Sequence, residues 1–279
     1  GKRATILFDG AMSHANVYIN GQKVGYWPYG YNSFHFDITK YLKPGEKNTL
    51  AVRLENLPES SRWYPGAGLY RNVHLIITED AYIPVWGTYI TTPSVNEKFA
   101  KVNVRTKVVL PEGADPAKYS VETSVWNPNK QKLTAVRTSL AQMKYNNNQA
   151  EQEFVIQAPS LWSPEMPALY SAETRLYEGD KLKDIYTTPF GIRSIEIIPD
   201  KGFFLNGKRT VFKGVCNHHD LGPLGAAVND AAIRRQIRIL KDMGCNAIRT
   251  SHNMPAPELI RACDEMGMMI MAESFDEWN

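Results

Sequence analysis

Three polar clusters in the last third of the chain contain residue types that can move protons, bind cations or hydrogen-bond a polar ligand. They are His218–Asp220, Ser251–Asn253 and Glu273–Trp278. Imidazole, carboxylate and amide groups gathered in one place could serve acid–base catalysis, metal binding or the recognition of hydroxyl groups. Which of these is available depends on whether the fold brings the three clusters together.

Each cluster closely follows a predicted β-strand, and the strands alternate with predicted helices. The strands are Thr210–Val215, Cys245–Arg249 and Met268–Ala272. Strands that alternate with helices of this length pair in parallel through right-handed crossovers. Ligands of such sheets bind at the carboxyl ends of the strands. The three clusters are therefore predicted to line one pocket wall.

Both connecting helices carry start and stop signals. The first is expected to have Asp230 as its N-cap and to end at Gly244, and the second is expected to begin at Pro257 and end at Gly267. Apolar residues recur at helical spacing, which predicts that both helices cover a sheet. These apolar residues are Ile233, Ile237 and Leu240 in the first helix, and Leu259, Ile260, Cys263 and Met266 in the second.

Two other arrangements of the histidine clusters are less favoured. Zinc could be bound by His218, His219, Asp220 and His252, but neighbouring residues on a strand point to opposite faces, so the two adjacent histidines cannot easily share a metal. Ser251 and His252 with Asp220 could suggest a nucleophilic triad. No Gly-x-Ser-x-Gly turn surrounds the serine, so this idea is weaker still.

Composition excludes several classes of partner. The 279 residues carry 32 basic and 29 acidic side chains, a net charge of +3 that is too small and scattered to indicate a nucleic acid or an anionic membrane. No run of about 18 apolar residues exists that could span a bilayer. The three cysteines do not indicate a disulfide framework. Both ends look cut from something longer, because Lys2 leads directly into a strand-like run and Asn279 follows a strand that no helix covers.

The first segment, residues 1–82, has the patterns of antiparallel β-structure. Asn20-Gly21 separates two strand-like runs and favours a tight hairpin, and Phe34–Thr39 alternates apolar and polar residues. A β-sandwich is the natural interpretation. A loop that contains Arg62 and Trp63 could stack on a sugar ring at a pocket edge or pack one domain against the next, and packing is favoured.

The middle segment, residues 83–195, contains about seven short strands separated by ordinary turn residues such as Pro111-Glu112-Gly113. This pattern suits an immunoglobulin-like β-sandwich. Almost none of its residues is catalytic in character. We interpret the segment as a spacer or scaffold.

In order along the chain, local motifs resemble those of glycoside hydrolase family two, which contains β-galactosidases, β-glucuronidases and β-mannosidases. The motifs include Val17–Gly21, Gly68–Val73, Leu161–Pro164, Phe190–Arg193 and Ile248–Asn253. The resemblance covers nearly the whole chain and implies a multidomain protein. Its parts would be a partial jelly-roll sugar-binding-type domain at residues 1–82, an immunoglobulin-like sandwich at 83–195, and the opening βαβαβ part of a TIM (β/α)8 barrel at 196–279.

The resemblance also implies roles for residues of the pocket wall. Asp220 would hydrogen-bond sugar hydroxyls, His252 would contact the ring at the scissile site, and His218 would lie on the same wall. The full set of expected substrate-binding residues is His218, Asp220, His252, Asn253, Glu273 and Trp278. The form of the strand exits is most similar to β-galactosidases of the bacterial polysaccharide-degrading type.

Retaining glycosidases need two carboxyl groups ~5–5.5 Å apart. In the family both are Glu residues on later barrel strands, and one belongs to an Asn-Glu pair that does not occur after Asn253 in this chain. No catalytic residue is therefore expected within the chain, which alone should not hydrolyse glycosides. A carboxylate pair built from Glu273, Asp276 and Glu277 is less favoured, because three strands supply only part of a barrel wall.

No cofactor is expected. Magnesium stays an alternative that the resemblance disfavours, because Glu277-Trp278-Asn279 stands where the family's magnesium-dependent galactosidases have a Glu and a His. The expected ligand is a β-galactoside, with no nucleic acid or membrane partner, and self-association stays open. The alternative is a carbohydrate-binding or scaffold module without catalysis, or a β-glucuronidase or β-mannosidase of the same family. The resemblance implies an exported bacterial enzyme, periplasmic or extracellular, with a cytoplasmic location left open.

Overall fold

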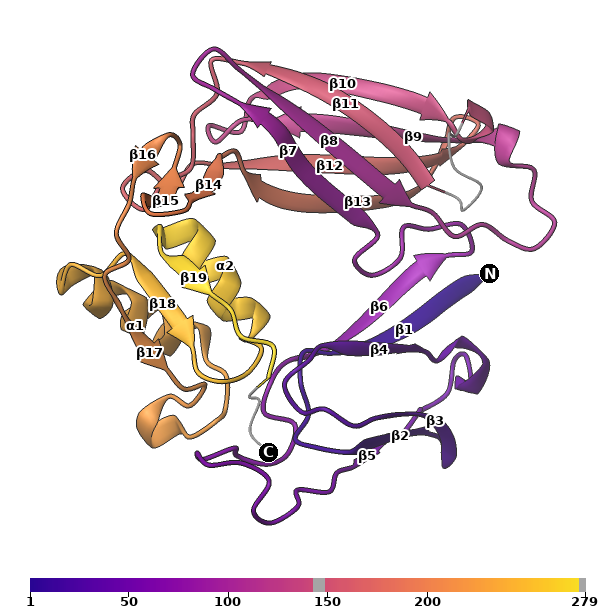
Figure 1. The fold of residues 1–279 in the computed structure, drawn as a ribbon. Coiled ribbons are helices and arrows are strands. Elements are labelled where there is room, and N and C mark those ends of the chain that lie inside the picture. The colour runs from indigo at the N-terminus through magenta and orange to yellow at the C-terminus, as the bar shows by residue number, and fades with distance from the viewer. Residues whose placement is uncertain (143–148, 276–279) are drawn as a thin grey trace. The chain divides into compact units, whose positions relative to one another are not determined.

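The computed structural model describes residues 1–142 and 149–275, and the chain divides into two compact units (Figure 1). One unit is Thr78–Val211 together with Gly1. The other combines Lys2–Ile77 with the segment that begins at Phe212. The first β-domain and the helix-containing segment therefore belong to one unit although more than a hundred residues of sequence separate them.

The first domain is a sandwich of two three-stranded sheets, as the alternating patterns predicted. One sheet has the order β4-β1-β6 and the other β3-β2-β5. Their strands are β1 (Lys2–Phe8), β2 (Ala15–Ile19), β3 (Gln22–Trp27), β4 (Phe34–Asp37), β5 (Leu50–Arg53) and β6 (Val73–Glu79). Every second residue of β1 and β2 faces the core, including Phe8 and Val17, both fully buried.

The β2–β3 hairpin has the predicted tight turn. Asn20 and Gly21 have φ angles of 51° and 79°. Ile19 pairs with Gln22, so the loop has two residues. Positive φ at both positions matches the right-handed twist of the strands, and Asn-Gly adopts it at little cost.

The middle domain is a seven-stranded sandwich, which confirms the expected immunoglobulin-like architecture. The sheets have the orders β10-β9-β12-β13 and β11-β8-β7. Their strands are β7 (Thr88–Val95), β8 (Phe99–Lys107), β9 (Tyr119–Trp126), β10 (Lys132–Ser139), β11 (Gln149–Gln157), β12 (Leu169–Glu178) and β13 (Lys181–Gly191). Trp162 is only 2% exposed, and the ring sits against Gly191, where a Cβ would come within 3.1 Å of Trp162.

A short antiparallel sheet precedes the parallel strands. It consists of β14 (Ile195–Ile198), β15 (Gly202–Leu205) and β16 (Lys208–Arg209). Thr210 still donates its amide to the carbonyl of Phe203, so the first parallel strand begins later than the predicted Thr210. It begins at Gly214, where a Cβ would lie only 2.0 Å from the Ala247 carbonyl oxygen of the neighbouring strand.

The last segment forms the predicted βαβαβ arrangement, with parallel pairing in the order β17-β18-β19. The elements are β17 (Gly214–Asn217), α1 (Asp230–Asp242), β18 (Ala247–Thr250), α2 (Pro257–Met266) and β19 (Met269–Met271). Single 3-10 turns occur at Thr39–Tyr41, Pro116–Lys118, Leu140–Gln142 and Gly222–Leu224.

Two details of the helices differ from expectation. The N-cap of α1 is Asn229, whose side chain accepts a hydrogen bond from the Ala232 amide, and Asp230 is the first helical residue. In α2, Ile260 is 39% exposed while Glu258 is 3% exposed, because Glu258 has a polar partner on the first domain. The predicted ends hold, with Pro257 in the first turn and a left-handed Gly267 at the C-cap.

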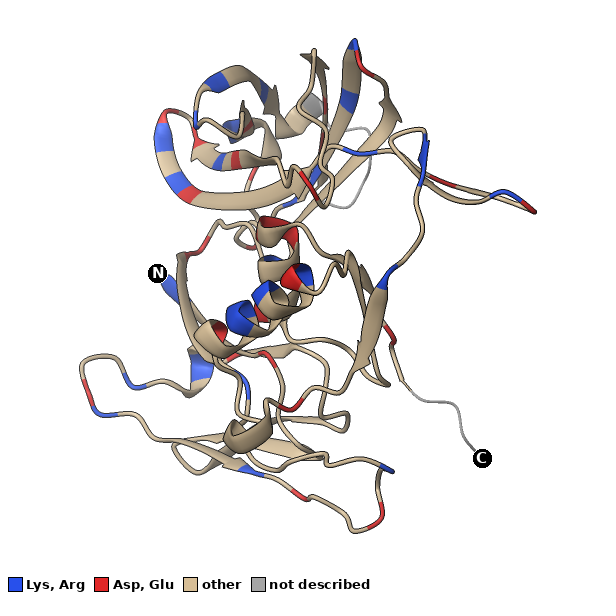
Figure 2. Cartoon of the chain, turned by 90° about the vertical axis from the view of Figure 1, so that its left-hand side faces the viewer, with Lys and Arg blue, Asp and Glu red and all other residues tan. Residues whose placement is uncertain are grey.

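Charges of both signs are interspersed over the strands and helices (Figure 2). On α1, Arg234 pairs with Asp230 at 2.8 Å and also with Glu265 of α2. Within the described residues no helix has the length and apolar character that crossing a membrane requires.

Candidate functional site

The exits of the three parallel strands bring His218, His252 and Glu273 together. The rings of His218, after β17, and His252, after β18, lie 5.9 Å apart in an edge-to-face arrangement. Nδ1 of His252 lies 2.7 Å from Oε2 of Glu273, which follows β19. His218 is exposed and forms no hydrogen bond within the described part of the chain. Its ring nitrogens are therefore available to a ligand.

Glu273 is held on both carboxylate oxygens. One oxygen forms an ion pair with Nε of Arg249 on β18, and the other accepts the hydrogen bond from His252. The backbone amide of Glu273 donates to Oγ1 of Thr250 at 3.0 Å. A carboxylate fixed in this way orients the His252 ring and is poorly placed to act as a free nucleophile.

Trp63, from the loop between β5 and β6, completes this wall. Its ring centroid is 5.7 Å from both His218 and His252. Its indole nitrogen donates to the Tyr31 hydroxyl at 3.0 Å, which fixes the ring orientation. Trp63 packs against the histidines of the parallel strands, and its stacking on a sugar stays a prediction. Trp63 and Arg62 also line a groove beside His252, so the loop reaches the pocket edge.

His219 has different partners from His218. Its Nε2–H donates to the Pro65 carbonyl at 3.0 Å, and its ring contacts Tyr31 and Tyr70 edge-on at 5.0 and 5.9 Å. Burial lowers the pKa of His219 below its ordinary value. The neutral ring therefore ties β17 to the first domain rather than facing a ligand.

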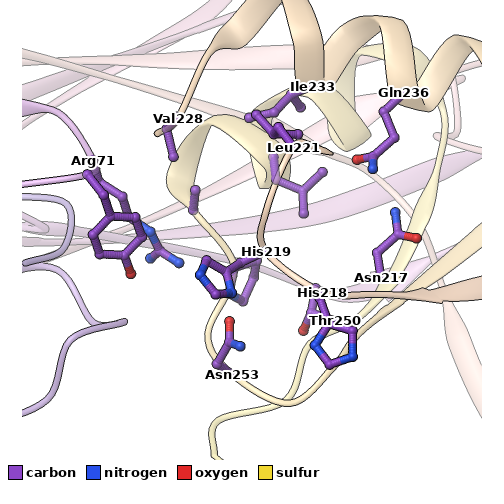
Figure 3. A pocket seen from close by; sticks show the side chains of 14 residues that line it. Arg71, Asn217, His218, His219, Leu221, Val228, Ile233, Gln236, Thr250 and Asn253 are labelled. Carbon is purple, nitrogen blue, oxygen red and sulfur yellow. The ribbon is translucent and has the colours of Figure 1, made fainter. Parts of the chain in front are cut away.

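Asn253 lies deeper than the pocket surface. It is 2% exposed, and with Asn217 and Thr250 it borders a narrow cavity of about 30 Å³ below the strand ends (Figure 3). This cavity is too small for a sugar ring. The side-chain nitrogens of Asn217 and Asn253 are buried there without a hydrogen-bond partner among the described residues.

Among the described residues, Asp220 has no contact with this cluster. Asp220 forms no hydrogen bond or ion pair with the described residues and borders neither cavity. Trp278, with Asp276 and Glu277, lies outside the described residues. The roles assigned to these side chains stay predictions.

A buried arginine that sequence reasoning missed anchors the site from below. Arg71 is 4% exposed and donates to the carbonyls of Tyr31 at 2.6 Å and Met254 at 2.8 Å. Met254 follows directly after His252 and Asn253. Next to Arg71, Asn72 donates to Glu258 of α2 at 2.5 Å. Two sequence signals marked the segment without indicating its partners: the Gly68–Val73 motif and the loop Arg62–Arg71, which carries two arginines.

A metal site does not fit the described residues. No three His, Cys, Asp or Glu side chains within residues 1–142 and 149–275 are arranged to hold an ion. Glu273, which accepts the hydrogen bond of His252, already pairs with Arg249.

Models of one family match almost the whole chain. The sugar binding domain of glycosyl hydrolases family 2 matches residues 1–79, the family 2 domain matches 82–193, and the family 2 TIM barrel domain matches 196–277. The chain belongs to glycoside hydrolase family 2. Proteins of this family act on carbohydrates, which agrees with a polar and aromatic wall at the strand exits.

Relatives within family 2 are considerably longer than this chain. A β-galactosidase of Bacteroides ovatus is 45% identical over 100% of the chain, which covers 33% of that protein. A β-glucuronidase of Bacteroides fragilis is 34% identical over 98% of the chain and 41% of its own length. The crystal structure of a family 2 member from Bacteroides cellulosilyticus superposes with a TM-score of 0.92 at 38% identity, covering 100% of the chain and 36% of that protein.

Proposed function

We propose that this chain supplies the sugar-binding wall of a retaining glycoside hydrolase that removes terminal β-galactosides from oligo- or polysaccharides. The observation that carries the proposal is the convergence of His218, His252 and Glu273 at the carboxyl ends of three parallel strands. The 45% identity to a β-galactosidase of Bacteroides ovatus supports galactose as the sugar.

The wall has the chemistry that sugar recognition needs. His218 and the unpaired Nε2 of His252 can exchange hydrogen bonds with hydroxyl groups, and the ring of Trp63 offers an apolar surface to sugar C–H groups. Arg249, the cation nearest to Glu273 on this wall, is paired with that residue. A neutral galactoside therefore suits the described wall better than a uronic acid, whose carboxylate would require an unpaired cation.

The two reactive carboxyl groups are proposed to lie on sequence beyond residue 279. Retaining hydrolysis needs a nucleophile and an acid/base ~5–5.5 Å apart. Glu273 is committed to Arg249 and His252, and no second carboxylate among the described residues faces it. The chain would bind and orient the sugar, and the remaining part of the barrel would cleave the bond.

Two preparations test this proposal. The purified 279-residue chain is expected to show no turnover of a nitrophenyl β-galactoside, while the chain extended by its downstream coding sequence should hydrolyse it and leave nitrophenyl β-glucuronide largely intact. A preference for the glucuronide would show that the substrate is a β-glucuronide instead of a β-galactoside. Turnover by the short chain that is lost in Glu273→Gln would overturn the assignment of the carboxylates.

The proposal includes an assembly and a location that follow from family resemblance. An exported enzyme, periplasmic or extracellular, suits a protein that degrades oligosaccharides. A homo-oligomer is compatible with the exposed edge of β19, where Met271 is 54% exposed. Sedimentation of the extended protein and fractionation of the source cells would test these two points.

A further inference from the structure

The narrow cavity below the strand ends is bordered by buried polar atoms that have no partner among the described residues. Its volume is about 30 Å³, and Leu221 and Ile233 belong to its apolar lining (Figure 3). The side-chain nitrogens of Asn217 and Asn253 are buried there, and His219, which also lines the cavity, has a buried and unpaired Nδ1. Native proteins pair nearly all buried polar groups with other protein groups or with ordered water.

The three unpaired atoms have complementary hydrogen-bond roles. Nε2 of His219 carries the proton that is donated to the Pro65 carbonyl, so Nδ1 of the neutral ring is an acceptor. The amide nitrogens of Asn217 and Asn253 are donors only. A buried water forms two to four hydrogen bonds. One water can therefore accept from both asparagines and still donate to His219.

The size of the cavity also fits water. A cavity holds a water molecule when about 10–15 Å³ is open to it and two to four polar partners are present. The cavity below the strand ends is larger than this minimum and offers three partners. We propose that it is a binding site for at least one ordered water molecule, which Asn217, Asn253 and His219 share.

The charges around the cavity disfavour an ion in the same place. A cation would face the N–H groups of two asparagines, and Arg71 also lines the cavity. An anion would face the lone pair of Nδ1 of His219, and the charge of Arg71 already interacts with Glu258 and Asp9. A neutral molecule of the size of water avoids both conflicts.

The shared water joins the two segments that carry the exposed histidines of the wall. Asn217 is the residue before His218, and Asn253 is the residue after His252. The backbone amide of Ser251 already donates to the Asn217 carbonyl at 2.8 Å, and the water adds a side-chain connection between the same segments. This site does not depend on which sugar the protein binds, so it can fail or hold independently of the proposed function.

Asn253→Leu tests the site in the purified 279-residue chain, with the folding equilibrium constant measured by urea denaturation. If the water is bound, leucine removes one of its partners and leaves the others short of a hydrogen bond, so we expect the constant to fall about fivefold to tenfold. Without the water, the same substitution only removes an unpaired buried nitrogen. The constant would then stay the same or rise, and the proposal would be overturned.

Asn32→Leu is the matched control in the same compact unit. Oδ1 of Asn32 is also buried without a partner among the described residues, but Asn32 does not line the cavity. Its replacement removes a comparable unpaired atom with no shared water beside it. We expect the folding constant of Asn32→Leu to stay the same or rise. A fall equal to that of Asn253→Leu would show that the loss does not come from the cavity, which contradicts the water site.

Two further measurements make the test independent of any one variant. Because both asparagines donate to one water, Asn217→Leu combined with Asn253→Leu should lower the constant by less than the product of the two single effects, whereas effects that multiply would contradict a shared water. A crystal structure of the unsubstituted chain should show a water within hydrogen-bond distance of Asn217 and Asn253. A cavity without density, or an anomalous signal there from added bromide, would refute the site even if the variants fail to fold.

Discussion

Two adjacent histidines follow β17 and have different environments, because His218 is exposed and His219 is half-buried. His218 is exposed beside Trp63 and His252, whereas His219 donates to Pro65 and packs on Tyr31. Nδ1 of His219 is buried without a partner among the described residues. Protonation of that nitrogen would place a charge where no acceptor receives it.

This environment predicts a pH dependence of stability. Burial lowers the pKa of His219 in the folded chain. As pH falls through about 6.5, the ordinary histidine value, the unfolded chain binds a proton that the folded chain excludes, so stability present above this pH is lost below it. The free energy of unfolding is measured by urea denaturation at pH 7.5 and at pH 5.5. We expect the decrease in this free energy from pH 7.5 to pH 5.5 to be smaller in His219→Gln than in the unsubstituted chain.

The control for this experiment is the neighbouring exposed histidine. His218→Gln removes an imidazole one position earlier in the chain without removing a buried group. It should leave the pH dependence as it is. An equal effect of the two substitutions would show that the burial of His219 does not control the pH response.

For single residues, the sequence predicted how side chains are oriented along a strand but not which residues they contact. Strand alternation predicted that His218 and His219 face opposite sides, and the structure gives them different partners, Trp63 for His218 and Pro65 for His219. The acceptor of His219 is Pro65, which lies 154 positions away in sequence. Such a contact depends on how two domains meet, and no local pattern encodes it.

Among the elements, the loop after β18 is fixed by the side chain of Arg71, which lies just before β6. Arg71 donates to the Met254 carbonyl in that loop and to the Tyr31 carbonyl in the first domain. Removing the guanidinium would leave these buried acceptors without partners. We expect Arg71→Met to lower the free energy of unfolding by about 3–5 kcal/mol in urea denaturation.

Arg3→Met provides the comparison, because Arg3 pairs with Asp37 at 3.4 Å on the surface. An exposed pair of this kind contributes about 0–1 kcal/mol. If both substitutions cost the same small amount, Arg71 does not join the two domains in solution.

The start of α1 gives a second test among the elements. Asn229 accepts the Ala232 amide with its side chain, whereas Asp230 pairs with Arg234 on the surface. Asn229→Ala should cost about 1 kcal/mol of unfolding free energy, and Asn229→Asp should restore most of it. Thermal unfolding followed by circular dichroism would measure both. If Asp230→Ala lowered the free energy of unfolding more than Asn229→Ala, Asp230 would be the N-cap.

Element types were easier to predict than their ends. Periodicity and turn residues predicted both sandwiches and the βαβαβ order, which the structure confirms. The cap of α1 was misplaced by one residue because Asn229 and Asp230 are both good capping residues. The burial of Glu258 could not be predicted, because its partner Asn72 lies on another domain.

For the whole molecule, the two compact units predict two unfolding transitions. The first domain and the βαβαβ segment share one unit, so substitutions in their separate cores should affect the same transition. Phe8→Ala and Ile237→Ala each remove a fully buried side chain. Each should lower the free energy of unfolding for that transition by about 2–5 kcal/mol, and therefore its transition temperature. Differential scanning calorimetry of the whole chain measures the shifts.

Leu176→Ala is the matched control in the middle domain, where Leu176 is also fully buried. It should lower only the other transition. If Phe8→Ala and Ile237→Ala shift different transitions, the first domain and the parallel strands unfold separately and the shared unit is wrong.

The central claim is that side chains at the ends of β17, β18 and β19 form the wall of a sugar site. The most direct measurement is a crystal structure of the extended protein with a bound galactose-derived inhibitor. We predict a sugar ring within hydrogen-bond distance of His218 or His252, with Trp63 beside it. A ring bound elsewhere, with these side chains facing only protein atoms, would contradict the account.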